Sequence, residues 1–187
     1  RVDGFSEELA NRLNVLRRSG LTFAPEAGTQ RLRDAINKNL SEEEILETAR
    51  KAFAGGWTAV KLYFMSGLPT ETLEDIEGIA RLGQKIVNLF YANPDKPKGK
   101  GVTVSVSVSC FVPKPFTPFQ WEPQDTIDVL REKQKHLAAS VTTRKISLSW
   151  HDAETSFLEA VLARGDRRLS AVLEEAYRRG CKLDSWS

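Results

Sequence analysis

The sequence has few cysteines, no long apolar run and little excess charge, and each shortage excludes a class of protein. Its 187 residues include two cysteines, Cys110 and Cys181, and no Cys/His cluster at metal-ligand spacing. This argues against a disulfide-rich secreted domain and against a zinc site. A net charge of +2 gives no electrostatic case for binding nucleic acid or a membrane surface. No secretory signal or transmembrane run is visible, so a reducing cytoplasm is the expected location.

Two nucleotide-binding fingerprints are also missing. The sequence contains neither Gly-x-x-x-x-Gly-Lys-Ser/Thr nor Gly-x-Gly-x-x-Gly, which weighs against a nucleoside triphosphatase and a dinucleotide-dependent enzyme. A nucleophile pair of Cys110 and His151 is conceivable, but no motif surrounds it. With 41% hydrophobic and 28% charged residues, the chain has the composition of an ordinary globular protein with one sizeable core.

The stretch over residues 59–71 is the most informative part of the sequence. Residues 59–65 form an apolar run, rich in β-formers and too short to span a membrane, which predicts a strand buried on both faces. Lys61 is the one charge in this run. Gly67 permits a positive φ or a close approach of the backbone to a ligand, and Pro69 favours a turn. The strand is therefore predicted to end here.

Strands and helices are predicted to alternate along the whole chain. The predicted helices begin at the capping residues Ser6, Thr29, Ser41, Thr72 and Thr126. The other predicted strands cover residues 21–24, 102–108 and 145–150, and two last helices cover 153–163 and 168–179. We read the Arg-Gly-Asp tripeptide between those helices as a turn. This alternation implies an α/β fold with parallel strands and right-handed crossovers.

The third predicted strand has an unusual polar face. Valines alternate with serine and threonine over residues 102–109, so one face of the strand carries hydroxyls. This pattern predicts that the hydroxyl face looks into a wet or ligand-filled interior. The next segment, residues 110–121, contains three prolines and several aromatic side chains. It is expected to pack as an ordered rim or lid.

The carboxyl ends of parallel strands meet at one edge, and ligands bind there. Residues 26–29, 66–71 and 109–114 fall at this edge and supply two glycines, two carboxylates, a thiol and backbone amides. Such a set suits a polar small molecule, for example a nucleoside derivative. In the simpler alternative Glu26 and Glu71 only cap their helices, and for Glu71 this is the interpretation we favour.

These segments resemble those of a known family. Residues 21–38, LTFAPEAGTQRLRDAINK, are similar to the fourth-strand segment of radical S-adenosylmethionine (SAM) enzymes, where a Glu-small-Gly turn leads into a helix ending in Asn-Lys. Residues 65–72, MSGLPTET, resemble the fifth-strand Gly-Leu-Pro-Gly-Glu-Thr segment. Residues 111–119, FVPKPFTPF, resemble the sixth-strand Pro-x-Pro-x-Thr-Pro segment. The resemblance is to the large bacterial members with an N-terminal cobalamin-binding-like domain, and it extends through residues 164–168.

The resemblance implies a partial TIM-like (half) barrel of parallel strands with helices outside. Residues 1–122 would form the C-terminal half of the barrel, and residues 123–187 the last helix and strand and a helical extension. In this family a [4Fe-4S] cluster cleaves SAM to a 5′-deoxyadenosyl radical, and cobalamin is a further cofactor that the resemblance allows. The family's Cys-x-x-x-Cys-x-x-Cys motif is missing here. The resemblance thus implies a piece that holds no cluster, metal ligand or catalytic residue and is inactive alone.

The resemblance also assigns residues to the cofactor. Glu26 would contact the SAM ribose, a turn with Thr70 in place of the commoner glycine would lie near the adenine, and backbone groups after the sixth strand would pair with the adenine edge. The cofactor-binding residues implied are Glu26, Gly67, Leu68, Phe111 and Val112. Cys110 matches no cluster ligand and would be a small residue that lines the pocket. The resemblance does not identify the substrate.

The expected partners follow from the half barrel. The first is the missing N-terminal half of the same barrel, and a second copy of the chain could instead pair with the exposed strand edge at residues 21–24. The alternative function is a noncatalytic module that docks a protein or structured RNA through an arginine-rich tail. That tail comprises Arg164, Arg167, Arg168, Arg178 and Arg179. No membrane partner is expected.

Overall fold

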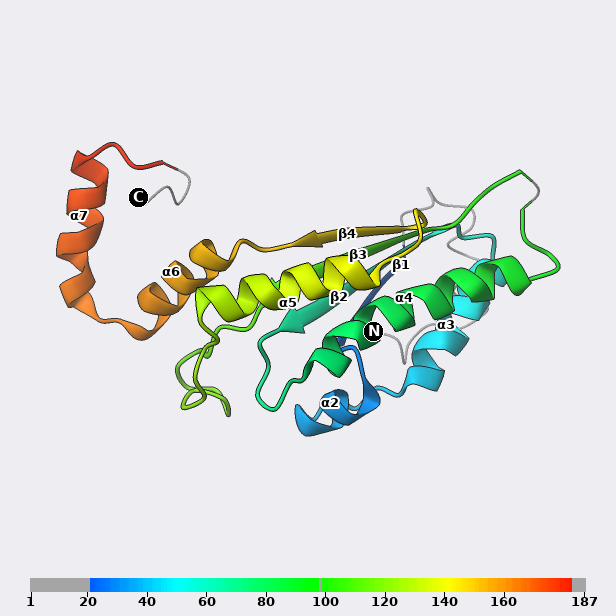
Figure 1. The fold of residues 1–187 in the computed structure, drawn as a ribbon, viewed down its shortest axis with the longest axis horizontal. Coiled ribbons are helices and arrows are strands. Elements are labelled where there is room, and N and C mark those ends of the chain that lie inside the picture. Colours follow the sequence, from blue (N-terminus) through cyan, green and yellow to red (C-terminus); the bar gives the residue numbers. More distant parts are fainter. Residues whose placement is uncertain (1–20, 98, 183–187) are drawn as a thin grey trace.

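The structure is a computed structural model that describes residues 21–97 and 99–182 (Figure 1). The helix predicted to begin at Ser6 lies outside these residues. Within them, strands and helices alternate along the chain as predicted. None of the helices in the described ranges has the length and apolar character needed to cross a membrane.

The described strands form a parallel sheet. They are β1 (Leu21–Glu26), β2 (Ala59–Ser66), β3 (Thr103–Cys110) and β4 (Ile146–Trp150). Their order in the sheet is their order in the chain, and each pairing is parallel. The prediction of an α/β fold with parallel strands is confirmed. Among the described strands β1 is an outer one, as predicted for the edge at residues 21–24.

Helices cover one face of the sheet. The three long ones are α3 (Glu42–Ala54), α4 (Leu73–Ala92) and α5 (Ile127–Ser140), and they lie side by side in front of the strands in Figure 1. The shorter α2 (Gln30–Ala35) follows β1. The predicted caps are confirmed, because the hydroxyls of Thr29, Ser41 and Thr126 each accept a hydrogen bond from a backbone N–H in the first turn.

The hydrophobic core lies between the sheet and these helices. Alternate residues of the two central strands point toward α4, where they meet Ile79, Ile86 and Phe90. The strand residues that fill this core are Val60, Leu62, Phe64, Val104, Val106 and Val108. Because burial of apolar area is the main favourable term in folding, this layer fixes the register of the strands.

The opposite face of the sheet is not covered by any described helix. The prediction that residues 59–65 are buried on both faces is therefore wrong for the described structure: Tyr63 on that face is 37% exposed. The hydroxyls of Ser105, Ser107 and Ser109 lie on the same face and are half-buried. The fold is thus a half barrel, with helices outside and a polar inner face.

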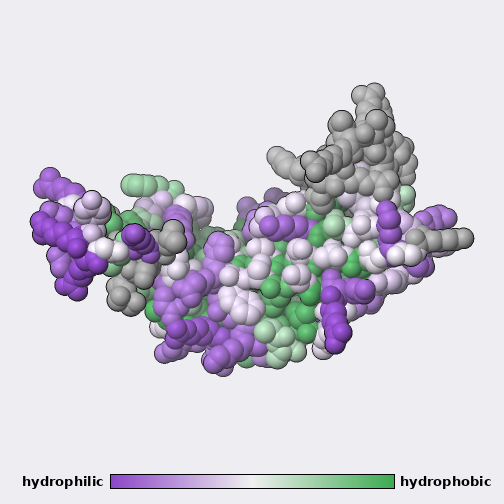
Figure 2. All heavy atoms as spheres, turned by 90° about the horizontal axis from the view of Figure 1, so that it is seen from above, coloured by the Kyte–Doolittle hydropathy of each residue, from purple (hydrophilic) through white to green (hydrophobic). Residues whose placement is uncertain are grey.

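A helical extension follows β4. It consists of α6 (Ala153–Arg164), a 3-10 turn (Arg167–Leu169) and α7 (Ser170–Arg178), and in Figure 1 it projects away from the sheet. The Arg-Gly-Asp tripeptide forms the turn between the helices, as predicted. The last helix is shorter than predicted because residues 167–169 adopt the tighter 3-10 form. Figure 2 shows hydrophilic side chains gathered at the α7 end of the molecule.

Candidate functional site

The three segments that follow β1, β2 and β3 meet at the carboxyl edge of the sheet. Ala27 and Leu32 from the first segment, Leu68 from the second and Phe111 from the third form one buried apolar cluster. Phe119 joins it with an edge-to-face contact to Phe111, at 6.0 Å between ring centroids. The prediction that these segments share an edge is confirmed, and apolar contacts hold them together.

A pocket of about 410 Å³ opens at this edge. Its walls combine apolar side chains with a thiol, an imidazole and hydroxyls. The lining residues are Met65, Ser109, Cys110, Phe111, Val112, Lys114, Thr117, Phe119, His151 and Glu159. An ion pair between Lys114 and Glu159 joins the loop after β3 to α6 across this lining. The volume is in the range of small-molecule sites.

The predicted cofactor residues divide into two groups. Phe111 and Val112 line the pocket. Glu26, Gly67 and Leu68 lie at the same edge but outside the lining, and Leu68 packs behind Phe111.

Glu26 ends β1 in an unusual conformation. Its backbone φ is 67°, and its carboxylate accepts a hydrogen bond from Lys38 Nζ at 3.2 Å. A positive φ is uncommon for a residue with a side chain. Thr29 caps α2, so the alternative in which Glu26 serves only as a helix cap is wrong. The contact with Lys38 instead fixes the Glu26 carboxylate beside the end of α2.

The turn after β2 is held by buried charges. Gly67 has φ 87°, as its predicted freedom allows, and its N–H donates to Glu71 Oε1 at 2.7 Å. Lys133 of α5 donates to the same oxygen at 2.7 Å and to Asp125 Oδ2 at 2.6 Å. The expectation that Glu71 caps a helix is wrong, because Thr72 is the N-cap of α4 and Glu71 points back to the turn.

Burial and charge set the ionisation of this group. The Glu71 side chain is only 2% exposed, and burial raises its pKa, although the hydrogen bonds from Lys133 and Gly67 oppose the rise. Burial lowers the pKa of Lys133, but the hydrogen bonds to Asp125 and Glu71 outweigh it, so the pKa lies above its ordinary value. The ammonium therefore stays charged and ties α5 to the β2 turn.

A second buried carboxylate joins the first and second segments. Asp75, at 2% exposure, accepts hydrogen bonds from the N–H and hydroxyl of Thr72 at 2.8 Å and from the side chains of Thr29 and Arg31. The predicted Thr72–Asp75 capping pair is confirmed. Burial raises the pKa of Asp75, but these hydrogen bonds outweigh it and the pKa is lowered.

Glycine permits the same two segments to touch. A Cβ on Gly28 would lie 2.1 Å from the carbonyl oxygen of Asp75, and one on Gly78 would lie 2.8 Å from the carbonyl carbon of Gly28. The turn after β1 therefore rests directly on the backbone of α4.

Cys110 lines the pocket, as the resemblance implied, but its thiol is not activated. Burial raises the pKa of this thiol, and its Sγ contacts the backbone oxygen of His151 at 3.7 Å and the Gln134 amide at 3.9 Å. The described contacts give no pairing with the His151 imidazole. A raised thiol pKa disfavours the thiolate that nucleophilic catalysis needs.

Only some side chains of the segment after β3 pack against the rim of the pocket. Phe111, Val112 and Phe119 pack inward, whereas Phe116 is 97% and Trp121 is 84% exposed. The prediction that this segment packs as an ordered rim or lid is therefore wrong for these two side chains, because no described element lies over them.

Sequence reasoning missed Lys133, Asp125 and the Lys114–Glu159 pair. For Lys133 a signal existed: it lies three residues after Leu130 and four before Leu137, on the apolar stripe of α5. A lone cation on a buried stripe indicates a buried carboxylate partner. Asp125 and Lys114 lie in irregular loops and Glu159 lies on a helix surface, where spacing carries no such information.

Comparison with known families gives no match to this chain. The chain is similar to an uncharacterised protein of Methanocaldococcus jannaschii, with 34% identity over 174 residues. This similarity covers 93% of the chain and 36% of the archaeal protein. The chain thus spans about a third of the length of that relative. In the described part of the chain, no three His, Cys, Asp or Glu side chains gather in a way that could hold a metal ion.

Proposed function

We propose that this chain supplies the C-terminal half of a radical SAM catalytic barrel and binds the adenosine part of SAM at the carboxyl edge of its sheet. One observation carries the proposal. The three segments that resemble the fourth, fifth and sixth strand motifs of this family meet there in one buried cluster of Ala27, Leu32, Leu68 and Phe111.

The pocket suits part of a nucleoside. Apolar side chains of Met65, Phe111 and Val112 could cover a planar base, and the hydroxyls of Ser109 and Thr117 could meet polar substituents. Glu26 would hold a ribose hydroxyl through Oε2, the carboxylate oxygen to which Lys38 does not donate. When bound and reductively cleaved, SAM supplies a 5′-deoxyadenosyl radical in this family.

The residues of this chain do not fit an iron–sulfur cluster. Three thiolates are needed to hold a [4Fe-4S] cluster with one open iron, and the chain has two cysteines. Cys110 and Cys181 lie on different elements, β3 and the end of the helical extension. On this proposal the cluster, and cobalamin where it is used, belong to the longer protein.

The parent protein provides the test. It is purified anaerobically, its iron and sulfide are measured, and electron paramagnetic resonance spectra are recorded after dithionite reduction with and without SAM. The proposal expects a reduced [4Fe-4S] signal that SAM perturbs. A protein that reconstitutes no cluster would refute the enzymatic function.

Glu26→Ala should weaken SAM binding in the parent, with Glu74→Ala as the control on the exposed start of α4.

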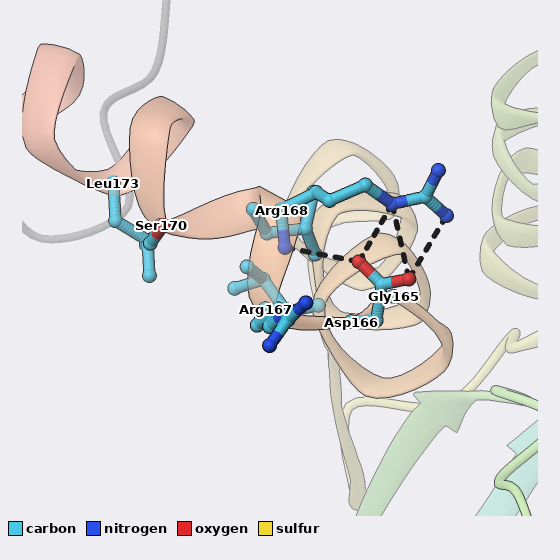
Figure 3. A pocket seen from close by; sticks show the side chains of 8 residues that line it. Gly165, Asp166, Arg167, Arg168, Ser170 and Leu173 are labelled. Carbon is cyan, nitrogen blue, oxygen red and sulfur yellow. Dashed lines mark hydrogen bonds and ion pairs between the residues drawn. The ribbon is translucent and has the colours of Figure 1, made fainter.

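A second candidate function is supported by the helical extension. Phe157, Val172 and Tyr177 on α6 and α7 are at least half exposed, and such apolar groups favour a protein partner. Structured RNA is less well supported, because three of the five arginines pair with nearby carboxylates: Arg168 with Asp166, Arg178 with Glu174 and Arg179 with Glu175. A shallow groove of about 700 Å³ lies between the helices, and the Arg168–Asp166 pair occupies its rim (Figure 3). Pull-down of the parent with and without residues 153–187 would test this function.

The outer edge of β1 is part of the same proposal. We infer that it pairs with the missing half of the barrel or, in this chain alone, with a second copy. Analytical ultracentrifugation of the chain should show dimers, and a monomer with rapidly exchanging β1 amides would contradict the pairing with a second copy.

The free thiols of Cys110 and Cys181 support a cytoplasmic location.

A further inference from the structure

The uncovered face of the sheet carries one row of polar side chains that crosses all the described strands. Lys61 of β2 is level with Thr22 of β1 on one side and with Ser105 of β3 on the other. Ser105 in turn is level with Ser147 of β4. Adjacent strands lie about 4.8 Å apart. The lysine is therefore flanked on both sides by hydroxyls on the same face.

Lys61 differs from the lysines near the carboxyl edge. Lys38 pairs with Glu26, Lys114 pairs with Glu159, and Lys133 pairs with two carboxylates. No described carboxylate lies within 4.0 Å of Lys61 Nζ. The Lys61 ammonium lies over the ring of Tyr63, at 4.7 Å from Nζ to the ring centroid.

This environment favours an anion. Lys61 is half-buried and its charge is not neutralised by a described carboxylate, so its ammonium can attract an anion. The hydroxyls of Thr22 and Ser105 can donate hydrogen bonds to the same anion. The Tyr63 ring holds the ammonium over the face of the sheet, because a cation is attracted to an aromatic face. The next row, Tyr63 with Ser107 and Ser149, continues the polar surface toward the carboxyl edge.

We propose that Lys61, Ser105 and Thr22 form an oxyanion site that binds the phosphate or carboxylate group of a small polar molecule lying against the inner face of the sheet. That this face is the inner one rests on the proposed function, because this face lines the inside of the barrel only if the barrel is completed by further strands. The anion site itself depends only on the row of side chains in this chain.

The experiment is a titration of the isotope-labelled chain with inorganic phosphate and, separately, with acetate, followed by nuclear magnetic resonance at constant ionic strength. The amides of Lys61 and Ser105 should shift together and saturate. Tighter binding of phosphate would assign a phosphorylated ligand, and tighter binding of acetate a carboxylate ligand.

Variants locate the binding. Lys61→Gln should weaken it at least about tenfold, because a charge-assisted hydrogen bond is lost. Lys61→Arg should retain it within about threefold, since the charge remains. Lys100→Gln, in the exposed loop before β3, should leave it unchanged. The amide spectrum of each variant also reports whether the sheet is intact.

Two results would overturn the proposal: neither anion shifts the Lys61 and Ser105 amides, or Lys61→Gln binds as tightly as the unaltered chain. Neither result bears on the cluster spectrum of the parent protein. Conversely, a parent that forms no cluster would leave the anion titration unaffected, so the two failures can be told apart.

Discussion

The ammonium of Lys133 and the backbone N–H of Gly67 share one oxygen of Glu71, each at 2.7 Å. A helix that comes late in the chain therefore fixes the backbone of a turn some sixty residues earlier. The turn carries Leu68, which packs against Phe111 behind the candidate pocket. The geometry of that wall thus depends on a buried ion pair distant from it in sequence.

Lys133→Met should destabilise the chain by about 3 kcal/mol, because it leaves Glu71 buried without its cation. Glu71 would then take up a proton more readily, so the loss should shrink as the pH falls. Urea denaturation between neutral and acidic pH measures both effects.

Lys135→Met, on the exposed side of the same helix, is the matched control and should cost little. The double variant Lys133→Met with Glu71→Gln should recover part of the stability, since the buried charge of Glu71 is removed together with its cation. The recovery is partial because Asp125, whose side chain is 29% exposed, also loses Lys133. An equal loss in the single and double variants would contradict the assigned role of the pair.

Thr70 occupies a position that favours glycine. It has φ 66°, and it follows Pro69 in a turn closed by a hydrogen bond from Glu71 N to Leu68 O at 3.1 Å. A β-branched residue is strained there, so Thr70→Gly should stabilise the chain by about 1 kcal/mol. The control is Thr103→Gly in β3, where the strand is extended and the same exchange should destabilise. Thermal unfolding of both variants decides the sign.

Gly28→Ala should destabilise by about 3 kcal/mol, because the new methyl would meet the backbone of α4 and the turn after β1 would have to move. Gly83→Ala on the same helix is the comparison. Its nearest neighbour is the terminal Cδ1 of Ile146 at 3.1 Å, which can rotate away, so the cost should stay below about 1 kcal/mol. Similar losses for both variants would argue against the direct backbone contact.

Asp75→Asn should cost about 2 kcal/mol at neutral pH, where the carboxylate accepts its charge-assisted hydrogen bonds. The folded pKa of Asp75 lies below the unfolded value of about 3.9. Its contribution is therefore complete above that value and is lost as the pH falls through the folded pKa. The difference in unfolding free energy between the two proteins should narrow over that acidic range. Glu74→Gln, an exposed neighbour, should show no such narrowing.

The fold was largely predictable because local signals agreed with one another. Capping residues such as Ser41 and Thr126 mark helix starts, and the alternation of valine and serine over 102–109 correctly separated the buried face of β3 from its polar face. The interpretation of residues 59–65 failed in one respect. Tyr63 and Met65 are apolar enough to suggest burial, but a run of apolar residues cannot reveal whether a second layer covers them.

The site was predictable only in outline. The carboxyl-edge rule brought the segments around Glu26, Gly67 and Phe111 together correctly. It could not place Lys133 or Glu159, because their partners come from elements whose distance depends on how helices pack against one another. Glu71 was misassigned for the same reason: its nearest charged partner is a residue of α5, far along the chain.

The order of strands in the sheet has a consequence for how the chain is made. Each described strand lies next to the strand that precedes it, and none is inserted between two earlier ones. Every new strand and helix can therefore dock as soon as it leaves the ribosome, onto an edge that is already present. Folding can keep pace with synthesis. Each edge that β2, β3 or β4 joins is then unpaired only for the time needed to translate the next helix and strand.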